Sequence, residues 1–267
     1  MTPNLELTRE ELQRYQRHLI MPEVGEEGQR KLKRARVLCI GAGGLGCPAA
    51  LYLAAAGVGT IGIADFDTVS LSNLQRQIAH RTADIGRPKT DSARDAALAI
   101  NPHVRIERHA ERLTPANALE LISAYDIVAD GSDNFPTRFL INDACYFAKK
   151  TLVSAAVTEF DGQLSTFKAH QPGCPCYRCL FADAPPPGTV PSCSETGVLG
   201  AAAGVMGTLQ ALEVIKEITG AGTGMAGRLL VYEALTTRFR TVTFKRDPAC
   251  ALCGENPTIR AIAATAI

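Results

Sequence analysis

The stretch VLCIGAGGLGCPAALYL, residues 37–53, contains a strand, a glycine-rich turn and the start of a helix in one run. The turn follows the pattern G-x-G-x-x-G and contains four glycines: Gly41, Gly43, Gly44 and Gly46. Such a turn lets the backbone approach phosphate closely, and the helix behind it offers free N–H groups. Asp65 ends the next apolar run, where a carboxylate can accept hydrogen bonds from ribose hydroxyls. These residues predict a nucleotide or dinucleotide site.

The segments around this turn alternate between strand-like and helical patterns. Apolar runs typical of strands cover residues 36–40, 60–65, 104–109, 126–130 and 151–157. Helical patterns lie between them at residues 45–56, 89–100, 115–124 and 135–149. Nearly continuous apolar strands separated by helices predict a Rossmann-like, doubly wound α/β fold, in which helices cover both faces of a largely parallel sheet.

The two ends of the chain follow other patterns. Thr8 and Glu11 form a capping box, which predicts a helix from about Arg9 that residues 22–29 interrupt. Alternating runs at residues 162–170 and 229–246 predict antiparallel strands that extend the sheet, and residues 197–218 form a helix of small residues between them. We expect an N-terminal helical arm, residues 1–34, and one α/β domain, residues 35–267. Its halves are residues 35–150, which bind the nucleotide, and residues 151–267.

The composition excludes several classes of partner. With 28 basic and 27 acidic residues the net charge is +1, so we expect neither a nucleic acid nor a membrane as partner. The sequence shows no secretory signal and no run long enough to span a bilayer, which favours a cytoplasmic protein. In that reducing compartment nine cysteines are expected to be metal ligands, reactive thiols or core residues. Cys39, Cys47 and Cys145 lie within strand or helix patterns and are expected in the core.

Polar residues after the strands decide between two nucleotide chemistries. The glycine turn alone favours an NAD-dependent oxidoreductase. However, Asn73, Arg76 and Lys89 follow the second strand, and Asp133 follows the fourth, where strand ends face the ligand crevice. Cleavage of a triphosphate requires cations for the phosphates and a carboxylate for Mg²⁺, whereas hydride transfer requires none of these. The residues therefore favour ATP, the oxidoreductase stays as the alternative, and no P-loop motif is present.

Two Cys-x-x-Cys pairs have the spacing of ligands to a tetrahedral metal: Cys176 with Cys179, and Cys250 with Cys253. Four thiolates without histidine favour a structural Zn²⁺ that ties distant segments together. Cys174 offers an alternative ligand beside the first pair. A free-standing zinc module for nucleic acid is an alternative of another class, and the neutral charge and the nucleotide crevice disfavour it.

Together GAGGLG, DFDTVSLSNLQRQ, GRPK, SDN and the two cysteine pairs resemble the HesA/MoeB/ThiF family of ubiquitin-activating-type adenylyltransferases, from about residue 14 to residue 253. The resemblance implies ATP on the glycine turn with its ribose on Asp65, phosphates held by Asn73, Arg76 and Lys89, and Mg²⁺ on Asp133. It implies that the substrate is a ubiquitin-like sulfur-carrier protein of the MoaD/ThiS kind. The carboxylate of its C-terminal Gly-Gly would attack the α-phosphate, giving an acyl-adenylate and pyrophosphate for molybdopterin, thiamine or related biosynthesis.

The same resemblance assigns two further residues. Arg17, in RYQRHL, matches an arginine that enters the active site of the other subunit, which implies a homodimer. Cys193, in VPSCSETGV, matches a cysteine that relatives use for a thioester, persulfide or acyl-disulfide after adenylation, although an exposed, dispensable thiol is the alternative. Longer relatives append a rhodanese domain that this sequence lacks, so we expect a separate sulfur donor. The α-carboxyl of the carrier is already ionised at neutral pH, so no catalytic base is expected.

Overall fold

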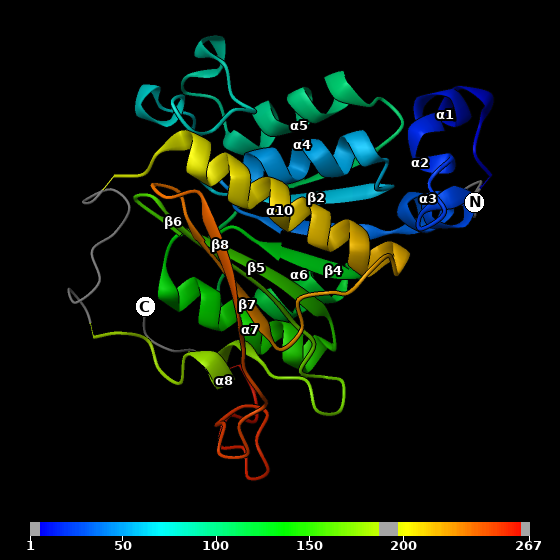
Figure 1. Cartoon of the computed structure of the whole chain (residues 1–267). Helices are drawn as coiled ribbons and strands as arrows, with labels where there is room; N and C mark the ends of the chain where they lie inside the picture. Colours follow the sequence, from blue (N-terminus) through cyan, green and yellow to red (C-terminus); the bar gives the residue numbers. More distant parts are fainter. Residues whose placement is uncertain (1–5, 187–196, 263–267) are drawn as a thin grey trace.

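The computed structural model describes residues 6–186 and 197–262. Its sheet has eight strands in the order β3-β2-β1-β4-β5-β6-β7-β8 (Figure 1). The strands are β1 (Arg36–Ile40), β2 (Thr60–Ala64), β3 (Arg105–His109), β4 (Ile127–Asp130), β5 (Thr151–Thr158), β6 (Asp161–Phe167), β7 (Arg228–Glu233) and β8 (Arg238–Thr243). The helices are α1 (Arg9–Arg14), α2 (Gln16–Leu19), α3 (Gly25–Arg34), α4 (Gly46–Ala56), α5 (Lys89–Ile100), α6 (Ala118–Ser123), α7 (Phe135–Ala148), α8 (Tyr177–Leu180) and α10 (Gly200–Thr219).

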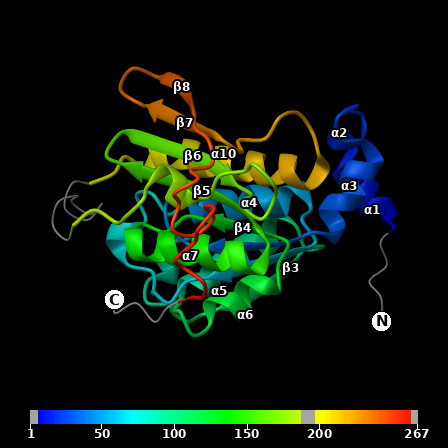
Figure 2. The ribbon, with the colours of Figure 1, turned by 90° about the horizontal axis from the view of Figure 1, so that it is seen from below.

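Strands β3, β2, β1, β4 and β5 are parallel, which confirms the predicted doubly wound sheet. Because side chains alternate along a strand, β1 contributes to two cores. Val37 and Cys39 pack with α4, α5 and α10, whereas Leu38 and Ile40 pack with α6 and α7. Figures 1 and 2 show these two helical layers on opposite faces of the sheet. Burial of both faces explains why β1, β2 and β4 are almost continuously apolar in sequence, whereas β3 at the edge of the sheet is RIERH and has no buried residue.

The remaining strands confirm the predicted antiparallel extension. β6 pairs antiparallel with β5, and β7 and β8 follow in the same manner. The run at residues 229–246 forms a hairpin, with Thr237 at φ 52° in the turn. The three cysteines expected in the core, Cys39, Cys47 and Cys145, are buried. The proposed boundaries between arm and domain halves stay predictions.

The N-terminal arm begins as predicted. Thr8 Oγ1 accepts from the backbone N–H of Glu11 at 3.2 Å, and Glu11 Oε2 accepts from the N–H of Thr8 at 2.8 Å. The helix is divided at Tyr15, whose φ and ψ of −96° and 13° separate α1 from α2. Tyr15 is buried, and its hydroxyl accepts a hydrogen bond from Asn101 Nδ2 at 2.8 Å, so packing of this ring fixes the break.

The predicted interruption at residues 22–29 is too long. Helix α3 already begins at Gly25. Its first turns are stabilised by ion pairs of the i, i+4 type, of which Arg30 with Glu26 is the closer at 2.7 Å. Leu32 is fully buried and anchors the helix in the main core. The two glycines and the proline of this segment suggested a loop, but charge pairing and burial outweigh their low helix propensity.

Helix α6 is shorter than the predicted helix at residues 115–124, because the segment before it folds around Asn117. The Oδ1 of Asn117 accepts from the N–H of Thr114 at 2.8 Å, which closes a turn at the helix start. None of the helices in the described ranges combines the length and apolar character needed to cross a bilayer.

Candidate active site

A cavity of about 390 Å³ opens at the carboxyl ends of β1, β2 and β4. Seven residues predicted for the site contribute to its lining: Gly41, Gly43, Gly44, Asp65, Arg76, Lys89 and Asp133. They come from segments that are far apart in sequence, and their convergence follows from the parallel strand order, because strand ends meet at one edge of such a sheet.

The glycine turn leaves the floor of this cavity open. Gly41 has φ 93°, and a Cβ on Gly46 would lie 1.7 Å from the carbonyl oxygen of Gly41, so both positions require glycine. Gly46 therefore shapes the turn instead of lining the cavity. A Cβ on Gly43 would meet nothing closer than 3.8 Å. No side chain caps the N-terminus of α4. The N–H of Cys47 donates to the carbonyl oxygen of Gly43 at 2.9 Å and Pro48 has no N–H, so in this first turn the N–H of Gly46 is the group left for an anion.

Asp65 is fixed at the end of β2 by two backbone groups. Its Oδ2 accepts from the N–H of Ala42 at 2.8 Å, and its Oδ1 accepts from the N–H of Asp67 at 2.9 Å. Each carboxylate oxygen has two lone pairs, so both can accept a second hydrogen bond from the cavity side. The carboxylate therefore lines the cavity with acceptor capacity to spare, and its contact with ribose hydroxyls stays a prediction.

Two cations face the glycine turn. The side chain of Lys89 is only 8% exposed, and its Nζ lies 2.8 Å from Asp67 Oδ2. Arg76 donates from Nη1 to the carbonyl oxygen of Ser72 at 3.0 Å. Asn73 does not line the cavity. Its Oδ1 accepts from the N–H of Ser70 at 3.2 Å and orders the turn that carries Arg76, so its contact with phosphate stays a prediction.

Asp133 is exposed and lies just before the N-terminus of α7. Its neighbour Asn134 caps α7, with Oδ1 accepting from the N–H of Thr137 at 2.9 Å. Nδ2 of Asn134 donates to Asp133 Oδ1 at 3.3 Å, which leaves the other carboxylate oxygen of Asp133 for a ligand. An accessible carboxylate that lines this cavity is the kind of oxygen donor that Mg²⁺ prefers.

A second carboxylate, Asp130, lies fully buried three residues earlier. Its Oδ1 accepts from the N–H of Ser132 at 2.9 Å and its Oδ2 from Ser154 Oγ at 3.0 Å. Burial raises the pKa of Asp130, against the opposing effects of the Arg138 guanidinium and of these hydrogen bonds. Asp130 is not part of the cavity lining and instead holds the loop that presents Asp133.

The raised pKa of Asp130 gives a sign for the dependence of stability on pH. A carboxyl group whose pKa is higher in the folded than in the unfolded state favours folding when it is protonated. Its contribution to the free energy of unfolding is complete below the pKa of the unfolded state, about 3.9, and is lost as the pH rises through the pKa of the folded state. Asp130→Asn keeps an acceptor for Ser132 and removes the titration. We expect its Tm relative to wild type to increase from about pH 4 to about pH 8 in thermal melts. A difference in Tm that is constant over this range would contradict the assignment.

Phe66, Gln77, Arg112 and Arg138 also line the cavity, although the sequence did not predict them for the site. Gln77 is 4% exposed, and its Oε1 has no partner among the described residues. Arg138 donates from Nε and Nη2 to the carbonyl oxygen of Ser132, at 3.3 and 3.0 Å. Gln77 follows Arg76 by one residue, and Arg138 lies in the first turns of the helix after Asp133, so proximity to predicted residues was the available signal.

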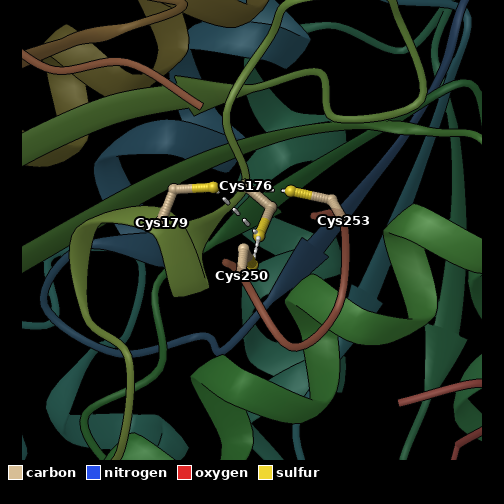
Figure 3. A group of neighbouring side chains, drawn as sticks. All are labelled: Cys176, Cys179, Cys250 and Cys253. Carbon is tan, nitrogen blue, oxygen red and sulfur yellow. Dashed lines mark hydrogen bonds between the residues drawn. The ribbon is translucent and has the colours of Figure 1, made fainter. Parts of the chain in front are cut away.

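The two cysteine pairs meet as predicted. The sulfur atoms of Cys176, Cys179, Cys250 and Cys253 all lie within 4.8 Å of one another (Figure 3). Three recorded Sγ–Sγ distances are 3.9, 3.6 and 3.4 Å. A tetrahedral zinc ion with Zn–S bonds of about 2.3 Å requires sulfurs about 3.8 Å apart, so the donor set fits zinc. Cys174 is not part of the group, which decides the first pair in favour of Cys176.

The neighbouring thiols shift one another's pKa values, and hydrogen bonds attach the cluster to α7. Hydrogen bonds from the thiols of Cys176 and Cys253 lower the pKa of Cys179, whereas hydrogen bonding to Cys179 and burial raise the pKa of Cys176, so the negative charge of the cluster is concentrated on Cys179. Arg178 lies between the first two cysteines and donates two hydrogen bonds of 2.8 Å to the carboxylate of Asp143 on α7. The cluster therefore connects β8 and the following segment to the second core.

Two predicted residues lie elsewhere. Arg17, on α2, is exposed and outside the cavity lining. Its neighbour Arg14 donates to the carbonyl oxygen of Ile100, the last residue of α5, whereas Lys89 is the first residue of that helix. Twelve helical residues span about 18 Å, so Arg17 and the cavity lie at opposite ends of α5. Cys193 lies outside the described residues.

The fold and this cavity define an α/β protein of the nucleotide-binding, doubly wound class, with cationic side chains beside the glycine turn and a four-cysteine cluster. The family model of the ThiF family matches residues 15–252, and the chain belongs to the ThiF family. It is 51% identical over 258 residues to the sulfur carrier protein adenylyltransferase of Thermus thermophilus, covering 95% of this chain and 94% of the relative. It is 53% identical to the probable adenylyltransferase/sulfurtransferase MoeZ of Mycobacterium tuberculosis, covering 92% of this chain and 64% of MoeZ.

Solved structures agree with the fold. PaaA superimposes with a TM-score of 0.76 at 23% identity, covering 90% of this chain and 76% of PaaA. MccB of E. coli with ATP superimposes with a TM-score of 0.75 at 21% identity, covering 85% of this chain and 69% of MccB. The relatives confirm the predicted adenylyltransferase of the MoeB/ThiF kind, and nothing in these comparisons supports the oxidoreductase alternative.

Proposed function

We propose that this enzyme uses ATP and Mg²⁺ to adenylylate the C-terminal Gly-Gly carboxylate of a ubiquitin-like sulfur-carrier protein. The observation that carries the proposal is the cavity in which Asp65 and the glycine turn face Arg76, Lys89 and Asp133. The chain spans 94% of the Thermus relative but only 64% of MoeZ, so the sulfurtransferase activity named for MoeZ belongs to that longer protein.

In this proposal each group of the cavity has its own task. Asp65 would bind the ribose, and the N-terminus of α4 would lie against the phosphates. Arg76 and Lys89 would neutralise charge at the α-phosphate while the carrier carboxylate attacks and pyrophosphate leaves. Asp133 would hold Mg²⁺, which supplies further neutralisation of the phosphates. Because the attacking carboxylate is already ionised, the rate depends on positioning and charge and requires no proton acceptor.

The cysteine cluster would hold a structural Zn²⁺. Four thiolates complete a closed tetrahedral site with no position for substrate, and the cluster lies outside the nucleotide cavity. Zinc would then stabilise the fold and take no part in the reaction. Cysteine thiols are kept reduced in the cytosol and are then free to bind metal, which supports a cytoplasmic enzyme.

Replacement of one ligand tests the zinc site. We expect Cys250→Ser to lose bound zinc and to lower Tm by about 10 °C, since a lost thiolate destabilises the fold by on the order of 3 kcal/mol. Zinc content by elemental analysis and Tm by calorimetry measure the two effects. Cys174→Ser is the matched control and should change neither. Retention of one zinc per chain by Cys250→Ser would contradict this ligand set.

The active enzyme would be a homodimer in which Arg17 of each subunit completes the cavity of the other. Cys193 would act after adenylation, as the acceptor of the activated carrier or of sulfur, and the sulfur would come from a separate donor. Transfer of sulfur for molybdopterin, thiamine or a related pathway would follow. Since Cys193 acts later, Cys193→Ser is expected to retain the adenylation step.

Exchange of labelled pyrophosphate into ATP tests the proposed function. The purified enzyme is incubated with ATP, Mg²⁺ and each Gly-Gly-tailed carrier protein of its host. Exchange that requires a carrier, together with detection of the carrier–AMP mixed anhydride by mass spectrometry, is the expected result. A carrier without its terminal glycine is the control and should support no exchange. Absence of exchange with every carrier would overturn the proposal.

A further inference from the structure

Two residues that line the cavity, Arg112 and Phe66, contact each other and have no role in the proposed reaction at the phosphates. The guanidinium carbon of Arg112 lies 3.8 Å from the centroid of the Phe66 ring. Phe66 directly follows Asp65, and Arg112 lies in the loop after β3, so the pair is located beside the ribose-binding carboxylate. We propose that Arg112, supported by Phe66, is the stacking platform for the adenine base of ATP. This inference rests on the proposed function and assigns the part of the cavity that recognises the base.

The free face of the guanidinium is the available stacking surface. A separation of 3.8 Å is one van der Waals thickness, so no ring fits between Arg112 and Phe66. Phe66 is 50% exposed and lines the cavity, so the pair is accessible to a ligand there. A base on the outer face of Arg112 would make a three-layer stack, in which the guanidinium interacts with both rings through its plane and its charge.

Arg112 is free for this purpose. Across residues 6–186 and 197–262, no carboxylate forms a recorded ion pair with its guanidinium, and the guanidinium donates no recorded hydrogen bond. The neighbouring arginines differ: Arg105 is paired with Glu107, and Arg108 with Asp91. An unpaired guanidinium fixed over a ring and facing a nucleotide cavity is consistent with a ligand group as its second partner.

The loop that carries Arg112 is held in place by one side chain. Nδ2 of Asn117 donates to the carbonyl oxygen of Arg112 at 3.0 Å and to Glu111 Oε2 at 3.2 Å. Its Oδ1 accepts from the N–H and from the hydroxyl of Thr114, at 2.8 and 3.2 Å. Asn117 therefore uses both donors and its acceptor to order the loop before ATP arrives. Such preorganisation reduces the entropy lost when the base binds.

The strand order places the adenine base on the side of the cavity next to β3. In a doubly wound sheet the ribose contacts the carboxylate after the second strand, and the triphosphate extends from there toward the glycine turn. Here the phosphate side is occupied by Gly43, Arg76 and Lys89, so the base must extend in the other direction, toward β3. The N–H of Asp65 donates to the carbonyl oxygen of His109 at 3.1 Å, which keeps the end of β2 beside the loop with Arg112.

Calorimetric titration of the full-length enzyme with Mg²⁺–ATP and with Mg²⁺–tripolyphosphate, which lacks the base, tests the platform. We expect Arg112→Ala to weaken ATP binding about tenfold and to leave tripolyphosphate binding unchanged within about twofold. Arg112→Lys should lose about as much ATP affinity as Arg112→Ala, because an ammonium keeps the charge and lacks the plane. Phe66→Leu should weaken ATP binding by about threefold. Arg105→Ala, on β3 and outside the cavity, is the matched control.

Three outcomes would overturn the platform. Unchanged ATP affinity in Arg112→Ala shows that the base lies elsewhere. Full affinity in Arg112→Lys, or a parallel loss of tripolyphosphate binding, shows that Arg112 acts as a charge on the phosphates. A wild-type enzyme that binds no ATP overturns the proposed function as well, so failure of the function and failure of the platform alone are distinguishable.

Discussion

Lys89→Ala is expected to lower carrier-dependent exchange of pyrophosphate into ATP by about 10²–10³-fold. The ammonium of Lys89 is buried in the cavity wall and lies 2.8 Å from Asp67 Oδ2, so it acts in a place from which water is largely excluded. A fixed cation in such a place stabilises developing charge far more than one in bulk water. The measurement is the initial rate of label exchange at saturating ATP and carrier.

The loss should appear in kcat more than in the KM for ATP, because the additional charge on the leaving pyrophosphate develops in the transition state and is absent from bound ATP. The structural cost is small, since Asp67 is half exposed and can be hydrated once its partner is removed. Lys31→Ala, which removes an exposed lysine of α3, is the control and should retain wild-type exchange. A folded Lys89→Ala enzyme with near wild-type kcat would show that the phosphates bind elsewhere.

Much of the fold could be predicted because local and tertiary patterns agree in the parallel half of the sheet. β1, the turn and α4 combine an apolar strand, obligatory glycines and a helix in 21 consecutive residues, Arg36–Ala56. The start of α3 was not predictable in the same way. Its glycines indicate a loop, and only the buried contact of Leu32 with the main core reveals why a helix forms there.

The convergence of polar residues in the cavity was predictable for a geometric reason. Asp65, Arg76, Lys89 and Asp133 follow strands whose ends must meet, so position along the chain already indicated their convergence. Asp130 was missed because sequence does not distinguish a buried carboxylate from an accessible one three residues away. Arg112 and Phe66 were missed because their contact joins loops after two different strands and belongs to no local pattern.

Arg17→Ala is expected to lower carrier-dependent exchange of pyrophosphate into ATP by about 10³-fold. Its activity should return in a mixed dimer with a Lys89→Ala subunit, which is inactive but retains Arg17. Arg17 lies at the opposite end of α5 from Lys89, as the contact of Arg14 with Ile100 shows. Figure 1 places α1, α2 and α3 together at one edge of the molecule. An exposed arginine there can act on a nucleotide only in a second copy of the chain, which a twofold dimer would supply.

Mixing two inactive variants gives the decisive measurement. Arg17→Ala retains Lys89, and Lys89→Ala retains Arg17, so a mixed dimer contains one cavity with both groups and one with neither. Random exchange of subunits should therefore restore about one quarter of wild-type activity, because half of the dimers are mixed and half of their cavities are complete. Arg9→Ala, an exposed arginine of α1, is the control and should be active alone. If the mixture stays inactive although subunits exchange, Arg17 does not act across the dimer, and the cavity must obtain its remaining cation, such as Arg138, from its own chain.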